Sequence, residues 1–538
     1  MGVTVFFSVL LSANSVPDTG IIAAMGPHDD PVILAFDIGT TGCKTALFES
    51  DGRFIGQRFS GYPTLRVENG GAEQDPESWW QAVCKTSQLL KIDYPSAFHR
   101  LGAVACCGIM NSCLPVDAHG EPLRYAMIHA DRRSGEQTSQ LVARIGDETA
   151  YQITGNRLEP YFSISKMLWY RQHESDLFAR TRWFLQAKDY IAGRLTGCWG
   201  ITDRSDASLT SCFDLKRNVW SGELLKAAGV PLRMMPAVIP STTIIGKVTP
   251  EASRETGFSA DVPVVLGGGD GACATQGAGA VKPGDAYLYL GGTAWLATLT
   301  AGLQPDPKMR LTAFCSLSPD FYVAYGTVQS AGSSVEWFLD AIGLGSVTDG
   351  DPYHQLDILA GQAEPGSRGL LFLPYLQGER SPIWNERACG LFFGLTSDHQ
   401  RQHLARAVLE GVVFALSTVL DAFHDQGLID KEDIRVIGGG ARSDLWRRMM
   451  AAAFQRSLLV MTHQREATSC GAAAAAAVAL GIVDDLSQAD IFNPVHHREE
   501  PDAALAEGMH RWKPLFSALY WLLADKMLER QQLMTNHL

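Results

Sequence analysis

Residues 264–271 have the sequence VVLGGGDG, an apolar run that ends in three glycines and one carboxylate, and this stretch decides the fold. The apolar run predicts a short buried strand, and the small residues after Gly271 predict a helix. Asp270 would then lie where a strand passes into a helix, a common position for a reactive side chain in α/β proteins. On local sequence alone, a helix-capping role explains the carboxylate equally well.

Length and composition limit the classes of protein to consider. The chain has 538 residues, 46% of them hydrophobic, and a formal net charge of -13. That length predicts about two to four domains. Because the basic residues form no dense run, nucleic-acid binding is not expected. The 11 cysteines are scattered without a C-x-x-C pair, which argues against a zinc site or a disulfide framework and favours reduced thiols in the cytoplasm.

The N-terminal residues are expected to lie outside the folded domains. Residues 3–11 are apolar, but they lack a basic flank and are much shorter than the ~20 residues of a bilayer span. Neither a signal peptide nor a membrane segment is therefore expected. Met25 stands just before the first convincing strand, so residues 1–24 are interpreted as an upstream extension of the reading frame. A weak targeting segment is the alternative.

A glycine-threonine hairpin follows the first predicted strand. Residues 32–36 (VILAF) predict a central strand, residues 37–42 (DIGTTG) predict a tight loop, and a second strand begins near Lys44. Backbone N–H groups and hydroxyls of such a loop can bind a phosphate, with Lys44 as a point charge and Asp37 available to a hydrated magnesium ion. An ordinary glycine-threonine turn is the alternative.

A second copy of this hairpin strengthens the phosphate interpretation. Residues 285–297 (DAYLYLGGTAWLA) again predict a strand, a glycine-threonine turn and a strand, and aligning Gly292 with Gly39 aligns the flanking strands. The chain is therefore expected to be internally duplicated. Two similar α/β halves would face each other across a cleft and hold a polyphosphate from both sides.

The segment between the hairpins predicts a substrate wall. The strand at residues 103–108 leads to Met110 and Asn111, and residues 127–130 lead to Asp131 and Arg132. A polyhydroxyl ligand requires carboxylates, amides and an arginine, because each buried hydroxyl left unpaired costs about 1–3 kcal/mol. For Asp131 and Arg132 a surface ion pair is the alternative.

Three later segments complete the pattern. Apolar residues at helical spacing from Leu404 to Phe423 predict a long packed helix. Residues 434–444 (IRVIGGGARSD) predict a strand and a glycine turn against which a flat nucleotide base can lie. The alanine run at residues 472–477 predicts a close-packed helix, and residues 512–534 predict a docked terminal helix.

Together these segments resemble the FGGY family of carbohydrate kinases from about residue 32 to about residue 483. Residues 161–170 (YFSISKMLWY) are similar to the family's first signature, and residues 390–395 (GLFFGL) with 403–410 (HLARAVLE) fit its second. Three further segments are most similar to the xylulose kinase branch: residues 188–190, 202–208 and 378–382.

The resemblance implies an α/β fold of two actin-like, ribonuclease-H-like domains, each with a mixed sheet flanked by helices, and a cleft between them. It implies four regions. Residues 1–30 would be an N-terminal extension, disordered or not native, and residues 31–275 the N-terminal domain with the sugar site and the first phosphate hairpin. Residues 276–490 would be the nucleotide-binding C-terminal domain, and residues 491–538 a tail with a docked helix.

The resemblance also implies transfer of the γ-phosphate of ATP to a hydroxyl of a small sugar. Asp270 would be the general base and would also contact the sugar, and Asp37 would hold hydrated Mg²⁺. Residues expected to bind ATP and its phosphates are Gly39, Thr40, Thr41, Lys44, Gly292, Thr293, Gly439, Gly440, Ala441 and Ser443. The other residues expected to bind the sugar are Met110, Asn111, Asp131 and Arg132.

The sequence differs from the usual xylulose kinase pattern at three positions where the sugar should bind. Xylulose kinases usually have histidine at the position of Asn111, tryptophan at that of His129, and asparagine at that of Gly271. A ketopentose such as D-xylulose is expected first, and another ketose, a polyol or a sugar acid is the alternative. A nucleotide-switched sugar sensor without turnover is a more remote alternative, which the presence of both Asp270 and Asp37 opposes. The resemblance is also consistent with a cytoplasmic homodimer that binds neither nucleic acid nor membranes.

Overall fold

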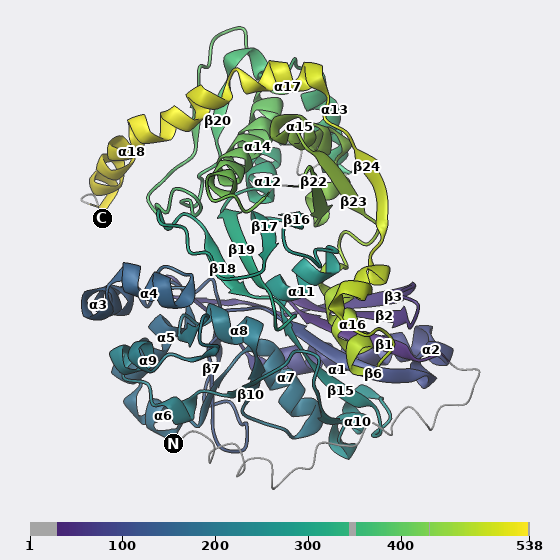
Figure 1. The fold of residues 1–538 in the computed structure, drawn as a ribbon. Coiled ribbons are helices and arrows are strands. Elements are labelled where there is room, and N and C mark those ends of the chain that lie inside the picture. Colours follow the sequence, from purple (N-terminus) through teal and green to yellow (C-terminus); the bar gives the residue numbers. More distant parts are fainter. Residues whose placement is uncertain (1–29, 344–350, 430, 536–538) are drawn as a thin grey trace.

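Two mixed β-sheets organise the chain (Figure 1). The computed structural model describes residues 30–343, 351–429 and 431–535. The extension expected at residues 1–24 lies outside these ranges. Helices cover both sheets, so each sheet is buried between layers of helix.

The first sheet has six strands in the order β14-β15-β6-β1-β2-β3. Strand β1 runs antiparallel to β2 and parallel to β6, which is in turn parallel to β15. The central strands are nearly all buried because helices cover both of their faces. The strands are β1 (Val32–Ile38), β2 (Gly42–Glu49), β3 (Phe54–Gly61), β6 (Leu101–Gly108), β14 (Ile244–Lys247) and β15 (Pro263–Gly269).

The second sheet repeats this arrangement, in the order β18-β19-β17-β16-β22-β23-β24. Strand β16 is antiparallel to β17 and parallel to β22, as β1 is to β2 and β6. The predicted duplication is thus present in the strand order and directions. The strands are β16 (Ala286–Leu290), β17 (Ala294–Thr300), β18 (Thr312–Cys315), β19 (Tyr322–Val328), β22 (Asp433–Ile437), β23 (Ser457–Met461) and β24 (Val495–Glu499).

Two crossed helices join the halves. Helix α11 (Asp270–Gly277) follows β15, and helix α16 (Ala467–Ala479) follows β23 but packs on β1 and β6 of the first sheet. A Cβ atom on Gly277 would lie 1.7 Å from the Ala467 carbonyl oxygen, and one on Gly471 would lie 1.9 Å from the Cys273 carbonyl oxygen. The backbones therefore touch, and the alanine-rich run forms the expected close-packed helix.

The long apolar segment predicted near residues 404–423 is α14 (Arg401–Asp425). Within the described ranges it is the one helix long and apolar enough to cross a membrane, and 89% of its most apolar window is buried inside the fold. It packs on β19 and on β20 (Leu371–Leu373), so it is a core helix of the second half.

The C-terminal region contains more than a docked helix. Strand β24 extends the second sheet, followed by α17 (Ala503–His510) and α18 (Lys513–Thr535). Buried Phe516 and Tyr520 attach the first turns of α18 to the second half. Residues 491–538 therefore contribute a strand to the sheet as well as the predicted terminal helix.

Candidate active site

A cavity of about 270 Å³ lies where the two halves meet, and we call it the acceptor cavity. Asp270 lines it from the N-terminus of α11, and Thr293 lines it from the turn between β16 and β17. Tyr161 and Trp295 are among several aromatic side chains in its wall. Because polar groups and flat apolar surfaces both face it, the cavity suits a small polyhydroxyl molecule.

Asp270 is the first residue of α11, and its Oδ1 accepts the N–H of Gly271 at 2.8 Å. Gly269, not Asp270, occupies the N-cap position, and no side-chain cap bond is made there. Burial, and next the charge of Asp37, raise the pKa of Asp270 to about 7. A carboxylate with a pKa near neutrality is well matched to general-base catalysis.

Asp37 is near the end of β1, directly opposite Lys44 on β2. Burial raises the pKa of Asp37, and the positive charge of Lys44 partly opposes this rise. In the described ranges no group of three or more His, Cys, Asp or Glu side chains could hold a metal ion. Asp37 alone still fits hydrated Mg²⁺, since this ion usually keeps several waters and binds through one or two carboxylates plus substrate phosphates.

Lys44 links the two halves. Its Nζ donates to the Arg465 carbonyl oxygen at 2.5 Å, in the loop that leads to α16. In the neighbouring turn between β1 and β2, Thr40 lines the acceptor cavity, whereas Gly39 and Thr41 line neither this cavity nor the one described next. The first hairpin therefore borders the acceptor cavity with Thr40 and contacts the opposite half with the Lys44 ammonium.

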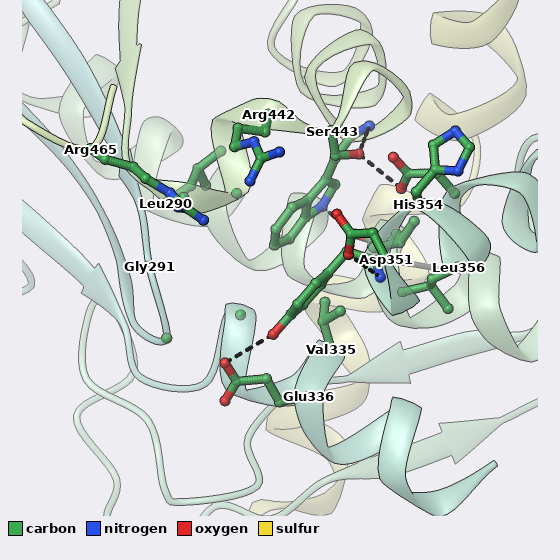
Figure 2. Close-up of a pocket in the computed structure, with 18 residues that line it drawn as sticks. Leu290, Gly291, Val335, Glu336, Asp351, His354, Leu356, Arg442, Ser443 and Arg465 are labelled. Atoms are coloured by element: carbon green, nitrogen blue, oxygen red, sulfur yellow. Dashed lines mark hydrogen bonds between the residues drawn. The ribbon is translucent and has the colours of Figure 1, made fainter. Parts of the chain in front are cut away.

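A second cavity of about 420 Å³ lies in the C-terminal half, and we call it the nucleotide cavity (Figure 2). Gly439 and Gly440 line it, as predicted for a surface that accepts a flat base, and Gly292 lines both cavities. Ser443 also faces it, donating to Asp357 Oδ1 at 2.9 Å and capping α15 (Asp444–Phe454). Ala441 is buried outside the lining.

Two arginines of the nucleotide cavity were not predicted as site residues. Arg442 follows the glycine turn, and Arg465 lies in the loop before α16 (Figure 2). Neither guanidinium makes an ion pair with another described residue. Such charges are well placed to pair with phosphates. The sequence signal for Arg442 was its place within the GGGARS segment, but Arg465 had no local signal.

Met110 and Asn111 line the acceptor cavity, as predicted. Asn111 has a left-handed backbone (φ 62°), and its side-chain oxygen is buried without a hydrogen-bond partner. His129 lines the same cavity, where burial, and next the charges of Lys166 and Arg380, lower its pKa to about 3. The imidazole is therefore neutral, so one of its ring nitrogens can donate a hydrogen bond and the other can accept one.

Asp131 lies outside the lining of the acceptor cavity. Its fully buried carboxylate pairs with Arg133, whose Nη2 lies 2.7 Å from Oδ2, and accepts the Ala72 N–H at 2.8 Å. This geometry gives no support to the predicted sugar contact of Asp131. Arg132 instead lines a small separate cavity that Tyr161 also lines. The Arg132 guanidinium lies 5.1 Å from the centroid of the Tyr161 ring and pairs with Glu386 at 3.3 Å.

Arg380 is the main acceptor-cavity residue that sequence reasoning missed. Its Nε donates to Gln329 Oε1 at 2.6 Å, its guanidinium lies 5.2 Å from the Tyr161 centroid, and no described carboxylate pairs with it. The preceding Glu379 accepts two backbone N–H groups at 2.7 Å, and burial raises its pKa to about 8. The GERSP segment at residues 378–382 was the available signal.

Family models match both halves of the chain. The N-terminal domain of the FGGY family of carbohydrate kinases matches residues 32–277, and its C-terminal domain matches residues 286–480. The chain belongs to this family. The expected class of enzyme, a phosphotransferase that acts on a carbohydrate hydroxyl, and the expected actin-like fold are thereby confirmed.

Proteins similar to this FGGY kinase include enzymes named xylulose kinase and enzymes named gluconokinase. The chain is 33% identical over 494 residues to the xylulose kinase of Escherichia coli (strain K12), covering 92% of this chain and 99% of that one. It is 30% identical over 502 residues to the gluconokinase of Bacillus subtilis (strain 168), covering 92% and 96%. The structure of ligand-bound xylulose kinase from Lactobacillus acidophilus matches with a TM-score of 0.86 and 28% identity, covering 93% and 99%.

Proposed function

We propose that this FGGY kinase binds ATP in the nucleotide cavity and transfers its γ-phosphoryl group to a hydroxyl of a small sugar or sugar acid in the acceptor cavity. The observation that supports this most directly is that Gly292 lines both cavities while Asp270 lines the acceptor cavity beside it. Phosphates held at the glycine-threonine turn would then point at a hydroxyl beside Asp270.

Several of the predicted residues have a role in this proposal. Asp270 takes the proton from the attacking hydroxyl, and Asp37 would hold hydrated magnesium, which would neutralise charge on the phosphates. The turns at Thr40 and Thr293 would contact the phosphates from opposite halves. Gly439 and Gly440 would lie against the adenosine. Most of the rate acceleration would come from positioning and charge neutralisation, as is general for phosphoryl transfer.

Arg380 favours a sugar acid, such as gluconate, as the acceptor. A partly buried guanidinium without a carboxylate partner is costly, and a carboxylate on the ligand would supply that partner. His129 is neutral and contributes no negative charge to repel such a group. A relative named gluconokinase supports the same choice.

A ketopentose such as D-xylulose is the second candidate. It is supported by the xylulose kinase relative and by the neutral polar groups of Asn111 and His129, which can pair with hydroxyls. In this case Arg380 would contact hydroxyls or the transferring phosphate. The two candidates therefore differ in what the Arg380 guanidinium recognises.

An ADP-release assay with Mg-ATP tests both candidates. Gluconate, D-xylulose, other ketoses and polyols would be compared for the wild type, Asp270→Asn and Arg380→Gln. One lost bidentate charge-assisted interaction is worth about 3 kcal/mol, or roughly 150-fold. If gluconate is the acceptor, Arg380→Gln should lower kcat/KM for gluconate by about that factor and leave the weak rate with D-xylulose nearly unchanged.

Two results would count against the proposal. A wild-type protein that binds ATP but consumes none with any acceptor would contradict kinase activity. An Asp270→Asn variant with full turnover would exclude Asp270 as the base. Strong wild-type turnover of D-xylulose, with none of gluconate, would select the second candidate.

A further inference from the structure

A fully buried ion cluster lies behind the acceptor cavity. The Lys188 ammonium is 2.6 Å from Asp189 Oδ1, 3.1 Å from Asp203 Oδ1 and 3.2 Å from Asp206 Oδ2, and all four side chains have no exposed surface. The cluster joins the first turn of α7 (Ala187–Thr196) to the first turn of α8 (Arg204–Leu209). Burying such charges costs more than packing apolar side chains of the same size, so stability alone explains the cluster poorly.

The cluster reaches Gly269, the last residue of β15 before Asp270, through one hydroxyl. Ser205 Oγ donates to Asp203 Oδ2 at 2.5 Å and accepts the Gly269 N–H at 2.9 Å. Ser241 Oγ donates to the same Asp203 oxygen at 2.9 Å. Asp203 is thus held by the ammonium and two hydroxyls, and it orients Ser205 toward the last backbone N–H before Asp270.

The glycines before Asp270 allow this close approach. A Cβ atom on Gly268 would lie 3.0 Å from Ser205 Oγ. One on Gly269 would lie 2.9 Å from Asp206 Oδ1 and 2.4 Å from the Met110 side chain. The glycine run therefore packs directly on the ion cluster and on Met110, which lines the acceptor cavity.

Asp206 differs from the other two carboxylates of the cluster in its hydrogen bonding. The Lys188 ammonium lies 3.2 Å from its Oδ2, no other described group hydrogen-bonds to either of its carboxylate oxygens, and burial raises its pKa well above the usual range. One ammonium cannot balance three buried carboxylates, so a proton on Asp206 reduces the net negative charge.

We propose that Ser205, held by Asp203 and Lys188, is a positioning residue that fixes the Gly269 N–H and thereby the placement of Asp270 against the acceptor hydroxyl. This inference rests on the proposed role of Asp270 as the base. The physical reason is that Asp270 follows Gly269 directly, so a shift of that peptide moves the carboxylate. A misplacement of about 1 Å can lower a rate by roughly a hundredfold.

The same helix offers a matched control. Ser208 lies one turn along α8 and is also fully buried. Its Oγ donates to the Ser205 carbonyl oxygen at 2.6 Å and accepts the Cys315 N–H at 3.1 Å. Ser208→Ala therefore removes a buried hydroxyl from the same helix without touching the Gly269 N–H.

Steady-state kinetics of Ser205→Ala and Ser208→Ala test the proposal. Ser205→Ala should lower kcat about tenfold or more, with KM for ATP and for the acceptor unchanged, because only the base is displaced. Ser208→Ala should keep kcat within about twofold of the wild type, although thermal unfolding would detect a loss of stability in both variants. A purely structural role would change both variants alike and would overturn the proposal.

A double mutant separates this inference from the proposed function. If Ser205 acts through Asp270, Ser205→Ala should have no further effect in the Asp270→Asn background, measured by single-turnover transfer of labelled phosphate. A full additional loss of rate would overturn the inference. An Asp270→Asn enzyme as active as the wild type would instead overturn the assignment of the base.

A second variant keeps the test decisive if Ser205→Ala does not fold. Ser241→Ala removes one donor to Asp203 and leaves Ser205 and the Gly269 N–H in place. It should lower kcat by a smaller factor, about two- to fivefold, again with unchanged KM values. Unchanged kcat in a folded Ser241→Ala enzyme would contradict the role of Asp203 in orienting Ser205.

Discussion

Replacing Asp270 with asparagine should lower turnover by roughly 10²–10⁴-fold and at the same time stabilise the ligand-free protein. Burial and the neighbouring Asp37 raise the pKa of Asp270 from 3.8 to about 7. The folded protein therefore resists ionisation of this group more than the unfolded chain does. Asparagine has nearly the same shape and carries no charge, so it removes that penalty.

The size and sign of the effect follow from the pKa difference. Both states are protonated well below pH 3.8, so there is no penalty there. As pH rises from 3.8 to about 7, the unfolded chain loses the proton first, and the free energy of unfolding of the wild type falls. Above pH 7 the full penalty is present, about 4 kcal/mol at 1.36 kcal/mol per pKa unit.

Urea unfolding at pH 5 and pH 8, without nucleotide or magnesium, measures this difference. The stability gain of Asp270→Asn over the wild type should be about 3 kcal/mol larger at pH 8 than at pH 5, because the penalty grows by about 1.36 kcal/mol per pH unit between pH 5 and about pH 7. Asp398→Asn, which removes a carboxylate from an exposed turn, is the control and should show no such difference. An equal gain at both pH values, or an asparagine variant less stable than the wild type at pH 8, would show that ionisation of buried Asp270 does not destabilise the folded protein.

Three further predictions concern the base, the nucleotide cavity and the crossed helices. The kcat/KM of the wild type should rise with pH to a plateau above about pH 7, because Asp270 must be ionised to accept a proton; a pH-independent profile between 5 and 8 would contradict this. Arg465→Gln should weaken ADP binding about tenfold in calorimetry and leave the acceptor KM unchanged, since Arg465 lines only the nucleotide cavity. In thermal unfolding, Gly471→Ala should lower the free energy of unfolding by about 3 kcal/mol, because its Cβ would lie 1.9 Å from the Cys273 carbonyl oxygen. The control Gly361→Ala, whose Cβ would have no atom from outside its own helix within 4 Å, should be nearly neutral in that assay.

Local sequence patterns were enough to predict the turns on which the site is built, and the family resemblance implied the actin-like fold class. The two glycine-threonine hairpins and the VVLGGGDG stretch are local patterns, and short-range backbone and burial preferences were enough to predict their strands. Because the chain repeats the same pattern, the cleft followed from the duplication. Thr40, Thr293 and Asp270 do line the cavity between the halves, as those local patterns predicted.

Only the tertiary structure decided which other side chains face the site. Asp131 turns into a buried pair with Arg133, two residues away, although the family resemblance implied that it contacts the sugar. Arg380 reaches the acceptor cavity from a segment more than a hundred residues beyond Asp270. The contact of Ser205 with Gly269 likewise joins two separate segments. The direction of a side chain depends on how distant elements pack around it, and no local pattern records that packing.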